Sequence, residues 1–139
     1  MSLRPHTPAD HYGRPLLAWL PAVGWAALIF ALSATPDLRF LPDLDLDLVV
    51  RKLGHMGIFG VLALLVWYAL ARTTDLPRPW AWAAGLTVLY AITDEFHQSI
   101  VAGRHASWVD VAIDAIGVVV ALVIATVIRR GRAGRARPA

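Results

Sequence analysis

The chain has 139 residues, of which 58% are hydrophobic, and it carries a formal net charge of +3 at pH 7. Soluble domains contain about 45–50% apolar residues, so this composition is typical of a membrane protein. The chain contains no cysteine, which excludes disulfides, thiol chemistry and cysteine-bound metal.

A helix that spans a bilayer needs about 20 consecutive apolar residues. Four stretches reach or approach this length: residues 15–34, 54–71, 79–98 and 108–128. The third stretch is polar only at its end and the fourth only at its start. The pattern predicts an all-α integral membrane protein, a four-transmembrane-helix bundle over residues 15–128. A flexible N-terminus (1–14) and a basic tail (129–139) flank this membrane domain.

The connections between the four stretches differ in length. Residues 72–78 and 99–107 are short and turn-like. Residues 35–53 are longer and contain the alternating sequence "DLDLDL". Alternation is compatible with a surface strand or with an amphipathic segment. We expect an amphipathic segment that lies at the bilayer interface.

Arginine and lysine set the expected orientation, because cytoplasmic loops are enriched in these residues. One side of the predicted bundle has nine of them: Arg4, Arg14, Arg72, Arg78, Arg129, Arg130, Arg132, Arg135 and Arg137. The other side has four: Arg39, Arg51, Lys52 and Arg104. Both termini are therefore predicted to be cytoplasmic. The basic tail fits this rule better than a nucleic-acid contact, so no nucleic-acid partner is predicted.

Small residues recur along the second and fourth stretches, where they allow helices to approach closely in lipid. They are Gly54, Gly57 and Gly60 in one stretch and Gly117, Ala121 and Ala125 in the other. We interpret them as ordinary packing positions. The four short helices are compatible with both a monomer and an oligomer.

Polar side chains gather at the outer ends of three predicted helices. Glu95 and Gln98 end the third stretch, and Asp110 and Asp114 share one face of the fourth at a spacing of four. A charged group in the apolar zone costs at least a few kcal/mol, so such residues normally face the bundle interior and find partners. We expect Arg104 to bind one of these carboxylates with both arms of its guanidinium.

Three interpretations of this cluster stay open from the residues alone. It could be a salt-bridge network that joins helices and has no chemistry. It could be a polar pocket in which Arg51, Lys52 and Arg104 hold an anionic headgroup while His55 or Glu95 moves protons. It could bind a metal through some of six residues, although their spacing forms no H-E-x-x-H motif. These six residues are His55, Glu95, His97, His105, Asp110 and Asp114.

Four motifs together resemble the VanZ-like family: "LSATPD", "RKLGHMGIFGVLALL", "DEFHQ" and "GRHASWVDVAIDAIG". These are small bacterial membrane proteins, named for a member linked to resistance to the glycopeptide teicoplanin. The family pattern matches Lys52, His55, Glu95, Gln98, Gly103, Arg104, Asp110 and Gly117. The chain departs from the pattern at Arg51, where an Asp is common, and at Asp114, where the family has Asn. The resemblance covers about residues 28–125.

The resemblance implies a multi-pass protein of the bacterial inner membrane with a role in the cell envelope and a possible link to glycopeptide resistance. Our leading hypothesis is that the cluster binds an anionic membrane lipid or lipid-linked envelope precursor. The predicted ligand-binding residues are Lys52, His55, Glu95, Gln98, Arg104, Asp110 and Asp114. The alternatives are an enzyme that acts on such a lipid, with His55 or Glu95 as acid–base, and a structural or partner-binding membrane module. We predict neither a metal nor a cofactor.

Overall fold

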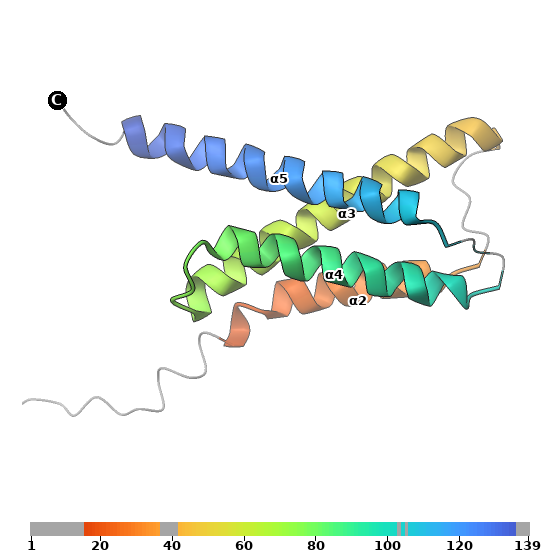
Figure 1. Cartoon of the computed structure of the whole chain (residues 1–139), viewed down its shortest axis with the longest axis horizontal. Coiled ribbons are helices and arrows are strands. Elements are labelled where there is room, and N and C mark those ends of the chain that lie inside the picture. Colours follow the sequence, from red (N-terminus) through yellow and green to blue (C-terminus); the bar gives the residue numbers. More distant parts are fainter. Residues whose placement is uncertain (1–15, 37–41, 103, 105, 136–139) are drawn as a thin grey trace, which may run out of the picture.

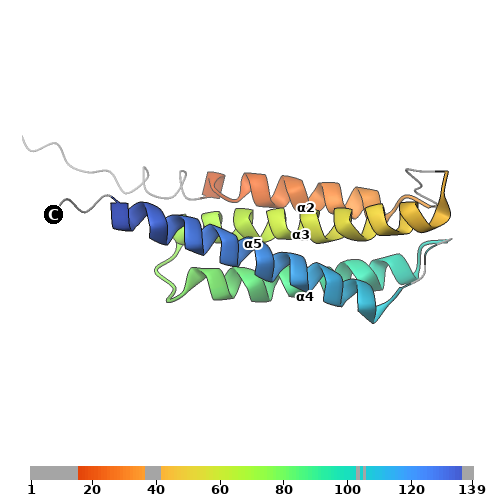
Figure 2. The same cartoon turned by 90° about the horizontal axis from the view of Figure 1, so that it is seen from above.

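The described part of the chain forms four helices that alternate in direction (Figure 1). The computed structural model describes residues 16–36, 42–102, 104 and 106–135. The helices are α2 (Leu20–Ser33), α3 (Leu44–Thr73), α4 (Pro79–Ser99) and α5 (Trp108–Arg135). In the view of Figure 2, α3 lies between α2 and α4, and α5 crosses in front of it. The described part of the chain contains no strand, as the all-α prediction requires.

The sequence "DLDLDL" forms the first turns of α3, so the alternative of a surface strand is wrong. Asp43 is the N-cap, and its carboxylate accepts a hydrogen bond of 2.9 Å from the backbone N–H of Leu46. Asp45 and Asp47 follow in the first turn, where negative charge is favourable to the helix dipole. The second helix therefore begins ahead of the apolar stretch, and it continues through this acidic segment without a break.

The other helices lie close to the predicted stretches. Helix α4 starts at Pro79 and α5 at Trp108, as predicted. Helix α5 continues to Arg135, so the first part of the predicted basic tail is helical. Helix α2 is shorter than its apolar stretch and covers 14 residues. The predicted flexible N-terminus, residues 1–14, lies outside the described residues.

Helix α3 is the centre of the core, and its C-terminal half packs against all three other helices. The buried apolar residues of this half are Phe59, Leu62, Ala63, Val66, Trp67 and Leu70. They meet Ala22 and Ile29 from α2, Ala83 and Ala91 from α4, and Val118 and Leu122 from α5. Burial of these side chains joins the four helices into one unit.

Helices α3 and α5 approach most closely where two glycines meet. A Cβ atom added to Gly117 would lie 2.1 Å from the backbone oxygen of Met56, and one added to Gly60 would lie 3.1 Å from the oxygen of Gly117. The predicted close packing is confirmed at Gly60, Gly117 and Ala121, because these residues bring two backbones together. Gly54 and Gly57 take no part, since a Cβ at either would meet nothing within 4 Å.

The outer faces of the bundle are unusually apolar. Large side chains that are half or more exposed include Leu20, Val23, Phe30, Trp82, Leu89, Val119, Val123 and Val127. An exposed apolar surface this extensive is typical of a protein that contacts lipid. Two helices, Leu44–Thr73 and the Trp108–Ala133 part of α5, are long and apolar enough to cross a membrane by length and composition.

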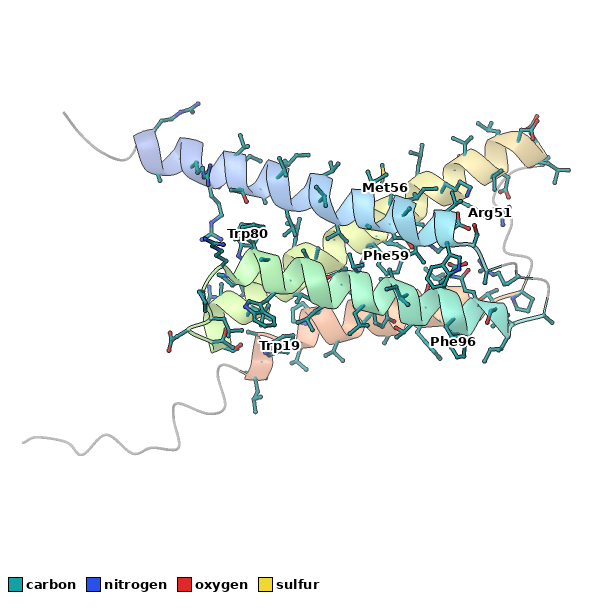
Figure 3. All side chains as sticks on the ribbon, in the orientation of Figure 1. Trp19, Arg51, Met56, Phe59, Trp80 and Phe96 are labelled. Carbon is teal, nitrogen blue, oxygen red and sulfur yellow. The ribbon has the colours of Figure 1, made fainter. Side chains whose placement is uncertain are left out.

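The two ends of the bundle differ in their side chains. At one end, the Trp19 indole N–H donates a 3.2 Å hydrogen bond to the Thr73 hydroxyl, and the Arg129 guanidinium lies 4.8 Å from the centre of the Trp67 ring. Figure 3 shows Trp19 and Trp80 near this end and Arg51 and Phe96 near the other. The second end contains most of the buried polar groups and is called the polar end below.

Candidate functional site

The polar end contains a pocket of about 370 Å³ between the start of α3, the end of α4 and the start of α5. Its lining includes six of the seven residues that the sequence predicts as ligand-binding: Lys52, His55, Gln98, Arg104, Asp110 and Asp114. Leu48, Arg51, Ser107 and Ile113 complete it. We call this space the polar pocket.

Two acid–base pairs connect α3 with α5 along one side of the polar pocket. The Lys52 ammonium binds the carboxylate of Asp110. One turn further, the Nδ1 atom of His55 lies 3.7 Å from Oδ2 of Asp114, whose side chain is almost fully buried. The spacings of three on α3 and four on α5 place each pair on facing sides of the two helices.

Arg51 belongs to a third pair, within α3. Its Nε atom lies 2.9 Å from Oδ2 of Asp47, four residues earlier, and Asp47 is buried. Asp47 was not among the predicted site residues. The i, i+4 spacing was visible in the sequence, but it becomes informative only once "DLDLDL" is known to be helical.

Arg104 does not bind a carboxylate in the described part of the chain, contrary to our expectation. Its guanidinium donates hydrogen bonds of 3.0 Å to the backbone oxygens of Leu32 and Thr35, and its Nε donates a further bond of 3.2 Å to Thr35. The last carbonyl groups of a helix have no partner within the helix. Arg104 therefore caps the C-terminal end of α2 from the loop before α5, because its five donors can reach several carbonyls at once.

Glu95 lies apart from the other predicted residues. Its carboxylate accepts a hydrogen bond from the backbone N–H of Ser107, the residue before α5. The Ser107 hydroxyl in turn accepts a 3.2 Å bond from the N–H of Val109, as an N-cap does. Glu95 lines a second, mainly apolar pocket of about 280 Å³ that also includes Phe96 and Trp108. Glu95 thus positions the start of α5 and does not line the polar pocket.

A buried hydrogen-bonded group between α2 and α4 contains Gln98, which was predicted as a site residue, together with Ser33 and Asp94, which were not. The Ser33 hydroxyl donates a 2.8 Å bond to Oδ2 of Asp94, and the Gln98 amide donates a 2.9 Å bond to the same oxygen. The Gln98 amide also lies 3.3 Å from the Ser33 hydroxyl. The spacing of Asp94 and Gln98 was a visible signal for one contact. Ser33 lies 61 residues from Asp94 in the chain, and only the fold brings them together.

The predicted histidines and acids do not converge on one point. Among the described residues, no group of three or more His, Cys, Asp or Glu side chains has an arrangement that could hold a metal ion. His97 stacks on the Phe30 ring, with 4.3 Å between the ring centres. His105, also considered as a ligand, lies outside the described residues.

The fold and the site define a small helical protein with an apolar outer surface and a polar pocket at one end. The model of the VanZ/LLP1 family matches residues 10–129, which is most of the chain. The chain therefore belongs to the VanZ/LLP1 family, and the resemblance seen in the four sequence motifs is confirmed. No curated protein and no solved structure matches it.

Proposed function

We propose that this VanZ/LLP1 protein crosses the bacterial inner membrane four times and binds the anionic headgroup of an envelope component in its polar pocket. The component is a membrane lipid, a lipid-linked precursor or another phosphate-bearing molecule. Residues 15–128 form the membrane domain in this proposal, and both termini are cytoplasmic. Any contribution to glycopeptide resistance would act through the bound component.

The observation that carries this proposal is the charge of the pocket lining. Three basic side chains, Arg51, Lys52 and Arg104, line the pocket together with the carboxylates of Asp110 and Asp114, and the buried Asp47 lies 2.9 Å from Arg51. Arg104 donates only to carbonyl oxygens among the described residues, so no carboxylate there neutralises its charge. Guanidinium and ammonium groups bind phosphate and carboxylate strongly where water is partly excluded.

A structural role is the second candidate, because Arg51, Lys52 and His55 each already have an acidic neighbour. The Lys52–Asp110 and His55–Asp114 pairs both connect α3 with α5. In this case the pairs would set the register of two helices, and the pocket would have no ligand. An enzyme that acts on the same lipid would have fewer acid–base candidates than predicted. His55 lines the polar pocket, whereas Glu95 does not.

Native mass spectrometry of the detergent-purified protein with a double variant, Lys52→Met and Asp110→Leu, separates binding from structure. Each side chain of this pair is about a third exposed, and a pair of that kind contributes no more than about 1 kcal/mol to stability. Replacing both partners leaves no unpaired charge. We therefore expect a folded variant that loses a lipid adduct seen on the wild type.

The matched control is the double variant Arg130→Met and Asp75→Leu, which removes the same two charges far from the pocket. It should retain the adduct. An adduct that persists when Lys52 and Asp110 are replaced contradicts the headgroup proposal. A wild type without any adduct, together with a strongly destabilised pocket variant, supports the structural role instead.

The orientation has an independent test, because the chain contains no native cysteine. Asp45, in the first turn of α3, and Asp75, two residues after its end, are both exposed and are the positions for single cysteines. A membrane-impermeant thiol reagent added to intact spheroplasts should label Asp45→Cys and leave Asp75→Cys unlabelled until the membrane is permeabilised. The reverse pattern would exclude cytoplasmic termini.

A further inference from the structure

A groove of about 220 Å³ lies between α2 and α3, beside the polar pocket. It shares three lining residues with that pocket: Arg51, His55 and Arg104. The rest of its lining is apolar except for Ser33, and consists of Leu32, Val50, Gly54 and Ile58. We call it the α2–α3 groove. The two spaces are therefore neighbours, and the lining changes from charged to apolar between them.

The groove exists because α2 parts from α3 toward the polar end while it stays in contact with α4, whose Tyr90 hydroxyl donates a 2.7 Å hydrogen bond to the backbone oxygen of Ala26. In its first half, the Trp25 indole N–H donates a 2.9 Å hydrogen bond to the backbone oxygen of Ile58 on α3. In its last turn, Ser33 also binds Asp94 on α4. Helix α2 thus leans toward α4 at the polar end, while the first turns of α3 diverge from it (Figure 1).

Gly54 keeps the groove open on the α3 side. An added Cβ atom at this position would meet nothing within 4 Å, so no neighbouring helix packs on it. Leu32 and Val50 at the edges of the groove are more than a third exposed. In a bilayer, such exposed apolar edges contact lipid chains.

The geometry points to a ligand that is an amphiphile, with its anionic headgroup in the polar pocket and its hydrocarbon chain in the α2–α3 groove. This inference rests on the proposed headgroup site and adds that the site opens sideways to the bilayer. Arg104 lines both spaces and caps α2, so it lies where the headgroup joins the chain. A water-soluble phosphate fills only the polar pocket, whereas a lipid phosphate fills both spaces and gains the van der Waals contacts of its chain with the groove lining.

The pocket beside Glu95 is the competing route for a chain. It is also mainly apolar, with Ile92, Phe96 and Trp108 in its lining. It shares only Ser107 with the polar pocket, against three residues for the α2–α3 groove. The groove is therefore the more continuous extension of the charged site.

The test uses a phosphatidate that has a photoactivatable diazirine near the end of one acyl chain, added to the full-length protein in detergent. Gly54→Leu fills the groove, and Gly57→Leu is the matched control, because Gly57 is equally unobstructed on the same helix and does not line the groove. Irradiation and intact-mass analysis give the adduct yield. We expect Gly54→Leu to reduce it about tenfold, the loss that 1.4 kcal/mol produces, and Gly57→Leu to leave it unchanged.

Two further measurements keep the outcomes separate. Protection of the protein by glycerol 3-phosphate against thermal unfolding reports the headgroup site alone and should be equal in both variants. Peptide mapping of the wild-type adduct needs no variant and should place it beside Leu32, Val50 and Ile58, which also covers the case in which Gly54→Leu does not fold.

The remaining results exclude either the groove alone or the groove together with the headgroup site. Equal yields in the two glycine variants, or adducts that map to Phe96 and Trp108, exclude the groove and leave the headgroup site standing. Protection by glycerol 3-phosphate without any phosphatidate adduct also excludes the groove. A wild type that responds to neither ligand overturns the headgroup proposal and this inference together.

Discussion

The two halves of α3 have opposite surroundings. Phe59, at the start of the C-terminal half, is 0% exposed, whereas Leu53, six residues earlier, is 57% exposed. The C-terminal half is packed against α2, α4 and α5. The N-terminal half borders the polar pocket and the α2–α3 groove. The change occurs beside the contact of Met56 and Gly60 with Gly117, where α3 and α5 cross (Figures 1 and 3).

This difference shows how a short bundle can contain both a packed core and a charged pocket. Helices that touch at one point and cross at an angle must separate on either side of it. On the packed side, helices α2 and α4 and large side chains such as Trp67 fill the space. On the other side, paired charges occupy it, because a charged group in an apolar environment is tolerable only with a partner.

The contact between Gly117 and Met56 should produce the largest effect when it is disturbed. In Gly117→Ala, the new methyl group collides with a backbone oxygen, which cannot move aside as a side chain can. We expect a loss of about 3 kcal/mol in the free energy of unfolding, at the upper end of what overpacking costs. Denaturant unfolding in detergent measures it.

Gly85→Ala on α4 is the control for that experiment, since its Cβ meets nothing within 4 Å. It should leave stability unchanged or raise it by up to about 1 kcal/mol, because Ala is the better helix former. Equal stabilities for the two variants would mean that α3 and α5 do not cross at Gly117.

The Ser33–Asp94 hydrogen bond should have an intermediate effect, because it holds α2 against α4 where α2 departs from α3. Ser33→Ala leaves the buried carboxylate with one donor fewer. We expect the free energy of unfolding to fall by about 1.5 kcal/mol, the usual loss for a hydrogen bond to a charged group. Ser99→Ala, at an exposed position of the same chain, should change it by less than about 0.5 kcal/mol. Identical losses would remove this bond as the reason for the tilt of α2.

The contact of Arg129 with Trp67 should have the smallest effect, although it lies at the well-packed end. Arg129→Ala removes a cation–π contact whose distance is 4.8 Å. Exposed contacts of this kind contribute about 0.5 kcal/mol, and the core beneath Trp67 remains. Arg130→Ala removes the same charge from the next residue and should have no measurable effect on unfolding. A loss of several kcal/mol in the free energy of unfolding of Arg129→Ala would mean that the contact of Arg129 with Trp67, and not the apolar core, stabilises the C-terminal half of α3.

Several features of the fold could be predicted because their signals are local. Helix α4 begins at the predicted proline, which is favourable in a first turn, and α5 begins after the N-cap Ser107. The alternating "DLDLDL" was ambiguous, because this sequence fits both a strand, in which side chains alternate with a period of two, and the acidic first turn of a helix. Its helical form follows from the N-cap Asp43 and the Asp47–Arg51 spacing taken together.

Contacts between distant residues could not be predicted in the same way. Arg104 was expected to bind a carboxylate, because carboxylate acceptors can be recognised from the residue type alone. The backbone oxygens at the end of α2 are equally good acceptors, but every residue has one, so nothing in the sequence marks Leu32 or Thr35 as the partners. The same reason kept Ser33 out of the predicted site.

The sequence by itself determined that the protein is helical, apolar on its outside and a member of the VanZ/LLP1 family, because composition, apolar segment length and motif spacing are properties of the chain. Only the tertiary structure decided that six predicted residues line one pocket while Glu95 lines another, and that a groove opens between α2 and α3. The physical reason is that helix periodicity specifies which side chains share a face. The point at which two helices cross depends on contacts such as Gly117 with Met56, more than 60 residues apart.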